Sequence, residues 1–244
     1  MPLSTINNSK ILPFALSIGE PSGIGPEIIL KSWMARSEQK LPVFFVVGDE
    51  RILAKTALKL GLDIPLQAVS CPSETGDIFQ NALPVLNITH DMDFEFGIPS
   101  THTAALTLGA IEKSVELIFD HKAAGLVTAP IQKSILYAAG FTCPGHTEYL
   151  AELCKKITSA PEMPVMMLVS DKLRVVPLTL HTPLVQVAKT ITPDLIHRTC
   201  EKINAALIQD FGLKNPRIAV AGLNPHAGES GTMGNEEQLV ITPA

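Results

Sequence analysis

The chain alternates between short apolar runs of strand length and longer segments whose apolar residues recur at helical spacing. The runs expected to form strands are residues 13–18, 41–48, 83–88, 125–128, 164–169, 173–180 and 217–223. The segments expected to form helices are residues 26–36, 50–60, 100–121, 148–156, 183–189 and 193–211. This repeated order of strand and helix predicts an α/β fold with a mostly parallel sheet.

The composition narrows the class of protein to a globular one. Of 244 residues, 46% are hydrophobic and 18% are charged, which excludes an intrinsically disordered chain. The formal net charge of -5 argues against nucleic acid as a partner, because phosphate backbones bind basic surfaces. No apolar run has the length of a membrane span, and the first ten residues lack the apolar core of a signal peptide.

The cysteines indicate the compartment. None of them forms a C-x-x-C pair, and their spacings fit no zinc ribbon. We therefore expect free thiols in a reducing cytoplasm. The four are Cys71, Cys143, Cys154 and Cys200.

Three histidines lie where an α/β sheet presents its ligand-binding edge. His181 and His226 directly follow expected strands, and His146 lies just before the helix expected from residue 148. Neutral imidazoles are common ligands of zinc and related ions, so these positions are candidates for a metal site. A loop histidine that only makes a hydrogen bond is the commoner case. His146 and Thr147 also lie near a helix N-terminus, where backbone N–H groups favour an anion.

Polar residues near other strand ends are more ambiguous. Residues 19–25, Gly-Glu-Pro-Ser-Gly-Ile-Gly, follow a strand and open a helix as a phosphate-binding loop does, but they match no nucleotide-binding motif. A tight strand-to-helix turn explains this segment equally well. Asp49 can cap the helix that follows it, and Lys133 is expected to be a solvated loop residue. We do not assign Asp49 to a ribose, because the first loop lacks the matching glycine pattern.

Four longer motifs carry a family resemblance. They are Ser-Ile-Gly-Glu-Pro-Ser-Gly-Ile-Gly-Pro-Glu at residues 17–27, Pro-Gly-His-Thr-Glu-Tyr at 144–149, Thr-Leu-His-Thr-Pro-Leu at 179–184, and Leu-Asn-Pro-His-Ala-Gly-Glu-Ser-Gly-Thr-Met-Gly at 223–234. Together, and in this order, they closely resemble the 4-hydroxythreonine-4-phosphate dehydrogenase family along nearly the whole chain. Each motif alone is moderately specific, whereas four in the same order are a strong signal.

The resemblance implies a two-domain fold like that of isocitrate and isopropylmalate dehydrogenases, and not a Rossmann fold. It implies a first α/β domain at residues 1–143, and part of a second, metal-binding and dimerising domain at residues 144–244. It also implies a homodimer that oxidises 4-phosphohydroxy-L-threonine with NAD or NADP and then decarboxylates the product to 3-amino-2-oxopropyl phosphate. This reaction belongs to pyridoxine and pyridoxal phosphate biosynthesis.

By the same resemblance, His181 and His226 bind a divalent metal (Zn, Mg or Co), while His146 and Thr147 contact the substrate. We expect both metal histidines to point into one cleft, and no residue is assigned to the nucleotide. The family's third metal histidine lies in a Tyr-His-Asp-Gln-Gly-Leu-Pro motif beyond the last residue of this chain. The resemblance therefore implies an incomplete chain, and we expect the 244 residues alone to have little activity.

Two other functions stay open. A paralogue of the same fold would keep the metal histidines and oxidise another alcohol, such as an aromatic cis-dihydrodiol carboxylate. A non-catalytic fragment would keep the fold and have lost the reaction, and the missing third histidine favours that alternative. Turnover of 4-phosphohydroxy-L-threonine, compared with turnover of a dihydrodiol, distinguishes these functions.

Overall fold

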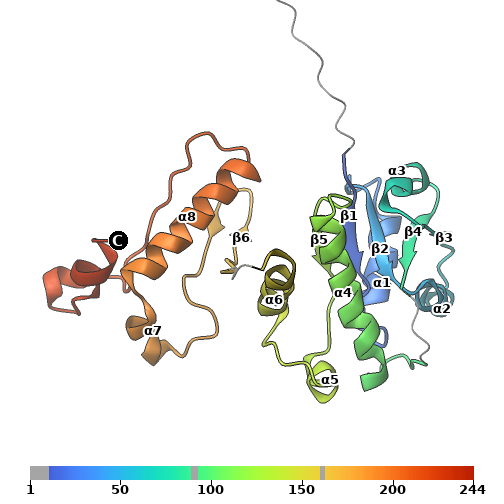
Figure 1. Cartoon of the computed structure of the whole chain (residues 1–244), viewed down its shortest axis with the longest axis horizontal. Coiled ribbons are helices and arrows are strands. Elements are labelled where there is room, and N and C mark those ends of the chain that lie inside the picture. Colours follow the sequence, from blue (N-terminus) through green and yellow to red (C-terminus); the bar gives the residue numbers. More distant parts are fainter. Residues whose placement is uncertain (1–10, 89–92, 160–162) are drawn as a thin grey trace, which may run out of the picture. The chain divides into compact units, whose positions relative to one another are not determined.

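A computed structural model describes residues 11–88, 93–159 and 163–244 (Figure 1). The chain divides into two compact units, Met1–Glu162 and Met163–Ala244, each of which is described by itself. Among the described residues, no helix is both long enough and apolar enough to cross a membrane.

A five-stranded sheet forms the centre of the first unit, and all of its strand pairs are parallel, as the sequence predicts. Strand β1 lies inside the sheet, with β2 on one side of it and β5 on the other. Every residue of β2 is buried, because the strand is covered on both faces and its sequence is accordingly apolar throughout. In sheet order, the strands are β3 (Leu66–Ala68), β4 (Leu83–Asn87), β2 (Phe44–Gly48), β1 (Phe14–Ser17) and β5 (Leu126–Thr128).

Helices cover both faces of this sheet. Figure 1 shows α4 on one side of the sheet and α1 on the other, as right-handed crossovers require when the strand order runs both ways from β1. One core cluster includes residues of both helices together with the strands between them. The helices of the first unit are α1 (Gly25–Met34), α2 (Glu50–Leu60), α3 (Thr75–Ile78), α4 (Ala104–Phe119), α5 (Lys133–Ala138) and α6 (His146–Thr158), with 3-10 turns at Pro72–Glu74 and Thr101–Thr103.

The tryptophan of α1 connects this helix to the end of α3, 46 residues later in the chain. Trp33 is 5% exposed, and its indole Nε1 donates a hydrogen bond to the carbonyl oxygen of Phe79 at 2.9 Å. The guanidinium of Arg36 lies 3.7 Å from the centroid of the indole ring. Such a cation–π contact, together with the hydrogen bond, holds the indole in one orientation.

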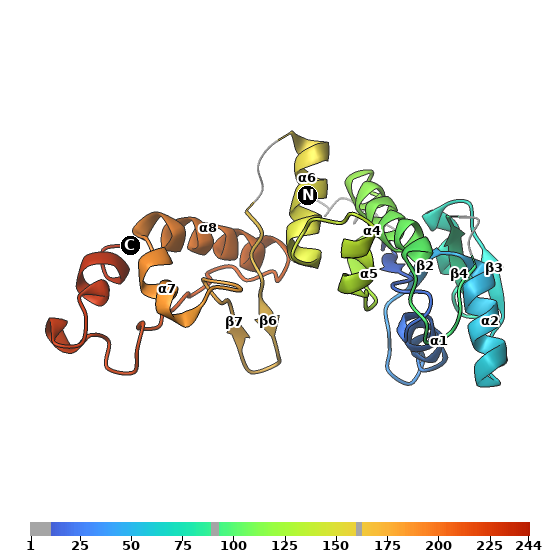
Figure 2. The same ribbon diagram turned by 90° about the horizontal axis from the view of Figure 1, so that it is seen from below.

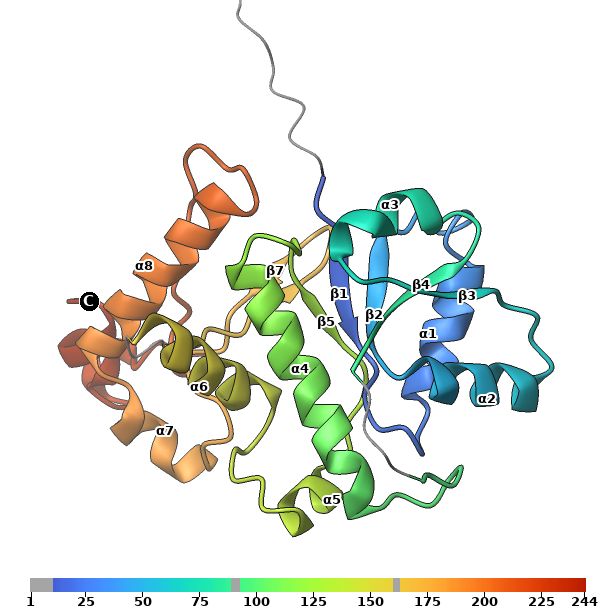
Figure 3. The same ribbon diagram turned by 45° about the vertical axis from the view of Figure 1, so that its right-hand side comes forward.

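Helix α6 packs against α4 and so belongs to the first unit (Figure 3). Tyr149 and Leu153 form a small core with Ile111 and Val115 of α4. The Tyr149 hydroxyl donates a hydrogen bond of 2.7 Å to a carboxyl oxygen of Glu112. The compact unit therefore ends later in the chain than the predicted first domain, residues 1–143, and the division into functional domains at 143/144 stays a prediction.

The second unit contains a short hairpin and one long helix (Figure 2). Strands β6 (Leu168–Val169) and β7 (Arg174–Val175) pair in antiparallel orientation. Helix α7 spans Leu184–Thr190, and α8 spans Pro193–Gln209 with its first turn capped by the Thr192 hydroxyl, which accepts from the Leu195 N–H. A 3-10 turn at Glu229–Gly231 and a π-helical turn at Glu237–Ile241 complete the unit.

Most predicted elements of the first unit are confirmed, whereas the strands predicted in the second unit are only partly formed. The strand predicted at residues 217–223 is wrong, since this segment forms no strand in the structure. The strands predicted at 164–169 and 173–180 shorten to two residues each. A strand is defined by a hydrogen-bonded neighbour, and within the described residues the 217–223 segment pairs with none.

Candidate functional site

The N-terminus of α6 offers uncapped backbone donors. His146 and Thr147 are the first two residues of this helix, which begins two residues earlier than predicted. Gly145, the N-cap, has extended backbone and no side chain that could accept a hydrogen bond from the first turn. The first-turn N–H groups and the positive end of the helix dipole therefore favour an anion here.

The imidazole of His146 lies at this helix end with an unused nitrogen. Its Nε2 is buried and has no hydrogen-bond partner among the described residues. Burial lowers the pKa of His146 below its ordinary value of 6.5, and the nearby Lys133 ammonium lowers this pKa further. A mainly neutral imidazole at pH 7 can accept a hydrogen bond or donate one, depending on its tautomer.

We expect the imidazole of His146 to titrate with a midpoint below 6.5 in the folded protein. Because the folded pKa is depressed, the contribution of His146 to the free energy of unfolding is complete above 6.5 and is lost as pH falls through the folded pKa. Histidine-selective NMR titration measures the midpoint, and a His146→Gln variant assigns the resonance. A midpoint at or above 6.5 would contradict the effect of burial and of the Lys133 charge on this pKa.

The glycine-rich loop after β1 is a tight turn, and its buried Glu20 carboxyl group is paired within the protein. Gly19 has φ +73°, and a Cβ atom there would lie only 2.6 Å from the carbonyl oxygen of Pro130. The Glu20 carboxyl, 3% exposed, accepts hydrogen bonds of 3.0 Å from the Ser22 N–H and from the Thr103 hydroxyl. Of the two explanations of this loop, the structure favours the turn over the phosphate-binding loop.

The carboxyl group of Asp49 is also paired within the protein. It caps α2 by accepting a hydrogen bond of 2.9 Å from the Arg51 N–H, as predicted. Its other carboxyl oxygen accepts from Arg51 Nη2 at 2.6 Å. Both oxygens are therefore engaged within α2, which agrees with leaving Asp49 out of a ribose site.

The two predicted metal histidines lie in irregular segments of the second unit. His181 has a backbone φ of +53° and is exposed. Neither His181 nor His226 directly follows a strand, so the predicted strand-end placement is wrong for both. The reason is the same for each: the preceding residues, 176–180 and 217–223, have no paired neighbour among the described residues.

His226 is nevertheless held in a defined orientation. Its Nδ1 lies 2.8 Å from Oε1 of Glu229, and its backbone N–H donates a hydrogen bond of 2.9 Å to Oδ1 of Asn224. The contact with Glu229 leaves Nε2 as the ring nitrogen for another ligand. A carboxylate that accepts from one nitrogen of a histidine is the usual support of a metal-binding imidazole. Sequence reasoning missed Glu229, although it follows His226 by three residues within a tight turn.

The described residues do not bring a full metal site together. They contain no group of three or more His, Cys, Asp or Glu side chains that could hold an ion. Catalytic zinc sites usually have three protein ligands and one open position. The metal assignment of His181 and His226, and their orientation toward one cleft, stay predictions.

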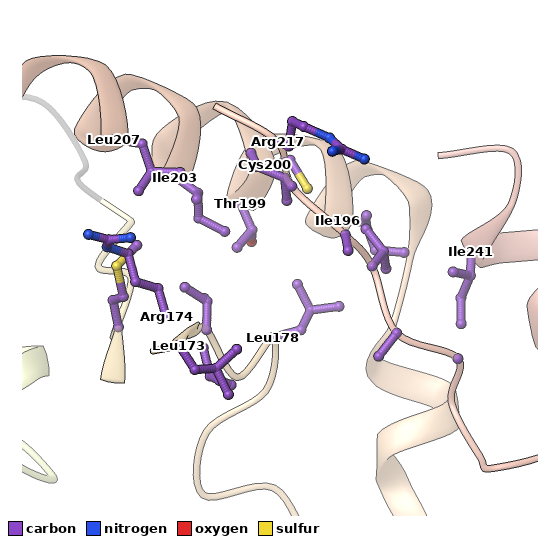
Figure 4. A pocket seen from close by; sticks show the side chains of 18 of the residues that line it. Leu173, Arg174, Leu178, Ile196, Thr199, Cys200, Ile203, Leu207, Arg217 and Ile241 are labelled. Atoms are coloured by element: carbon purple, nitrogen blue, oxygen red, sulfur yellow. The ribbon is translucent and has the colours of Figure 1, made fainter. Parts of the chain in front are cut away.

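The second unit contains a mainly apolar pocket. Figure 4 shows Thr199, Ile203 and Leu207 of α8 pointing toward Leu173 and Leu178 across a cavity of about 750 Å³. None of the four predicted site residues lines it. Its lining also includes the cationic residues Lys172, Arg174 and Arg217. We do not take this pocket as the candidate substrate site, because the predicted substrate residues His146 and Thr147 do not line it.

The comparisons with known proteins begin with the family model for "Pyridoxal phosphate biosynthetic protein PdxA", which matches residues 40–244. The chain belongs to this family. A 4-hydroxythreonine-4-phosphate dehydrogenase of Methylorubrum extorquens is 44% identical over 234 residues, which cover 95% of this chain and 67% of the relative. The corresponding protein of Bradyrhizobium diazoefficiens is 43% identical and covers 97% of this chain and 70% of the relative. This PdxA chain thus spans about two thirds of the length of these relatives.

Solved structures agree with the PdxA assignment. A 4-hydroxythreonine-4-phosphate dehydrogenase from Burkholderia phymatum matches with a TM-score of 0.83 and 33% identity, covering 96% of this chain and 70% of that one. A terephthalate 1,2-cis-dihydrodiol dehydrogenase from Burkholderia xenovorans matches with a TM-score of 0.62 and 22% identity, covering 96% of this chain and 69% of that one. At this identity, the likeness shows the fold alone. The predicted family and the predicted α/β fold class are confirmed.

Proposed function

We propose that this protein is an NAD(P)-dependent 4-hydroxythreonine-4-phosphate dehydrogenase of pyridoxal phosphate biosynthesis. The observation that carries the proposal is 44% identity to a relative of that name over 95% of the chain. The dihydrodiol dehydrogenase is supported less well, because its likeness at 22% identity extends to the fold alone.

The proposed reaction has two steps. The carbon that bears the secondary alcohol of 4-phosphohydroxy-L-threonine transfers a hydride to the nicotinamide, and the hydroxyl loses its proton. The resulting β-keto acid then loses its carboxyl group as carbon dioxide and takes up a proton, which leaves 3-amino-2-oxopropyl phosphate. The protein's own task is to position and polarise the reactants, because the nicotinamide accepts the hydride.

The candidate residues take distinct roles in this proposal. His146 and Thr147 bind and orient the substrate at the N-terminus of α6, where donors and the helix dipole favour an anion. His181 and His226 hold the divalent metal, and Glu229 keeps Nδ1 of His226 engaged. The metal, when bound, lowers the pKa of the alcohol and polarises the ketone. Two imidazole ligands favour zinc or cobalt over magnesium, which prefers oxygen.

Replacing Glu229 with glutamine should weaken binding of Co²⁺ or Zn²⁺ by about 10- to 100-fold, because the carboxyl group no longer orients His226 and supports its basicity. Titration of the protein with Co²⁺, followed by its visible absorption, measures this affinity without any turnover. Glu201→Gln on α8 is the matched control, since Glu201 is 3.7 Å from the exposed His197. Equal affinities in the parent and in Glu229→Gln would show that Glu229 does not support a metal ligand.

The proposal includes a homodimer in the cytoplasm. None of the four cysteines, all of which lie in the described part of the chain, forms a disulfide, which fits a reducing compartment. Light scattering after gel filtration measures the assembly, and a monomer at micromolar concentration would remove the homodimer from the proposal.

The test of function is direct. The protein, purified as the complete product of its reading frame, is mixed with 4-phosphohydroxy-L-threonine, Zn²⁺ or Co²⁺, and NAD or NADP, and the reduced nicotinamide is followed by absorbance. Turnover of this substrate, with little turnover of an aromatic cis-dihydrodiol carboxylate, is the expected result. The reverse preference would favour the paralogue, and binding of the substrate without turnover would favour a non-catalytic protein.

A further inference from the structure

Lys133 lies at the edge of the sheet where open α/β folds bind their ligands. The segment after β5 leads through Pro130 to Lys133, the first residue of α5. Strand β5 lies on one side of β1 and β2 on the other, so the strand order reverses at β1. Ligands of such sheets bind beyond the carboxyl ends of the strands at this reversal.

The ammonium of Lys133 reaches the N-terminus of α6. A Cβ atom added at Gly145 would lie 3.4 Å from Lys133 Nζ and 3.3 Å from Glu148 Oε2. Lys133 is exposed, and it has no hydrogen-bond or ion-pair partner within the part of the chain that the structure describes. A lysine that passes within this distance of a helix N-cap, and stays unpaired beside a carboxyl group, has its donors available for another anion.

The surroundings of Gly145 bring several donors together. Burial is the larger cause of the lowered pKa of His146, and Lys133 is close enough for its charge to lower this pKa further. The buried Nε2 of His146 has no partner, and the first turn of α6 has no side-chain cap. Glu148 is the acidic residue of that first turn, and its charge opposes an incoming anion. A cation at Lys133 offsets this repulsion.

We propose that Lys133 binds the phosphate group of the substrate, together with His146 and the N-terminus of α6. This proposal rests on the proposed function and adds a residue to its substrate site. A phosphate group carries a charge of about −1.5 to −2 at pH 7 and has three strong acceptor oxygens. It can therefore accept from the ammonium, the imidazole and a backbone N–H at the same time, whereas a carboxylate has two oxygens and a single charge.

Three variants test this proposal. Lys133→Met should raise the KM for 4-phosphohydroxy-L-threonine about 10- to 100-fold and change kcat much less, because the contact is made before and during the reaction alike. Lys133→Arg should restore most of the affinity. Lys155→Met is the matched control, since Lys155 is exposed in the last turn of the same helix and its loss changes the net charge equally.

A second measurement needs no turnover. Inorganic phosphate is titrated into each variant and its binding is followed by 31P NMR. We expect Lys133→Met to weaken phosphate binding about as much as it raises KM, and Lys155→Met to leave it unchanged. Circular dichroism confirms that each variant is folded.

The outcomes separate this proposal from the proposed function. Equal KM and equal phosphate affinity in the parent protein and in Lys133→Met would overturn the role of Lys133, even if the enzyme turns over the substrate. A fall in kcat with unchanged KM would overturn it as well. If the parent turned over no 4-phosphohydroxy-L-threonine, the proposed function would fail, while phosphate binding that depends on Lys133 would still support the anion site.

Discussion

Replacement of His226 by alanine should lower kcat/KM for 4-phosphohydroxy-L-threonine by at least about 100-fold. Loss of a residue that only supports a metal ligand typically costs about 10- to 100-fold in affinity or activity, and the loss of a ligand itself should cost at least as much. The fold should survive, because the His226 side chain is 54% exposed and its polar contacts lie within one turn. Steady-state kinetics at saturating metal measure the effect, and elemental analysis measures bound metal.

A second histidine variant serves as the control. His197 lies on α8 with its side chain 63% exposed and 3.7 Å from Glu201. His197→Ala should keep kcat/KM within about twofold, as surface substitutions usually do. If His226→Ala retained the parent's kcat/KM and metal content, the metal assignment of the Asn-Pro-His motif would be wrong.

Replacement of Glu20 by alanine should lower the free energy of unfolding of the first unit by about 2–4 kcal/mol. Its carboxyl group is buried and pairs with the Ser22 N–H and the Thr103 hydroxyl. The variant leaves the Ser22 N–H without its acceptor, whereas the Thr103 hydroxyl keeps the Ser100 carbonyl. The variant also leaves a void between the loop after β1 and the turn that opens α4. Amide hydrogen exchange in β1 and β2, measured as urea is raised, reports the stability of this unit.

Glu27→Ala is the matched control for this variant. Glu27 forms an i,i+4 pair with Lys31, whose side chain is 59% exposed, and such pairs contribute about 0.3–0.5 kcal/mol. A loss of less than 1 kcal/mol in Glu20→Ala would mean that water replaces the carboxyl group without penalty, and the tight-turn explanation of the loop would then lose its energetic basis.

Local pattern was enough to predict the sheet of the first unit. Strands β1 and β2 are continuous apolar runs because both faces of each are covered, and β2 is buried at every residue. The short elements β3, α3 and α5 were missed, and Lys133 is the first residue of a helix rather than a loop residue. Three to six residues contain too little periodicity to detect. Segment 217–223 is a predicted strand that does not form. Its apolar run predicts burial, but a strand also needs a hydrogen-bonded neighbour, which the run itself does not specify.

The residues of the candidate site also differ in how far the sequence alone could place them. Thr147 and His146 could be placed at a helix N-terminus because that position depends only on neighbours in sequence. The approach of Lys133 to Gly145 could not be predicted, because it depends on how the segment after β5 folds back toward α6. The bond between Glu20 and Thr103 joins residues 83 positions apart, and pattern within a window carries no information about such a pair.

The position of Trp33 determines which of the two units can be followed by intrinsic fluorescence. Trp33 is the single tryptophan of the chain, and the two tyrosines, Tyr137 and Tyr149, lie in the same unit. Residues 163–244 contain neither chromophore. Intrinsic fluorescence excited at the indole band will therefore register the melting of Met1–Glu162 and remain silent when Met163–Ala244 unfolds. A tryptophan introduced at Phe211 would give the second unit a signal of its own, and the two transitions could then be separated in one sample.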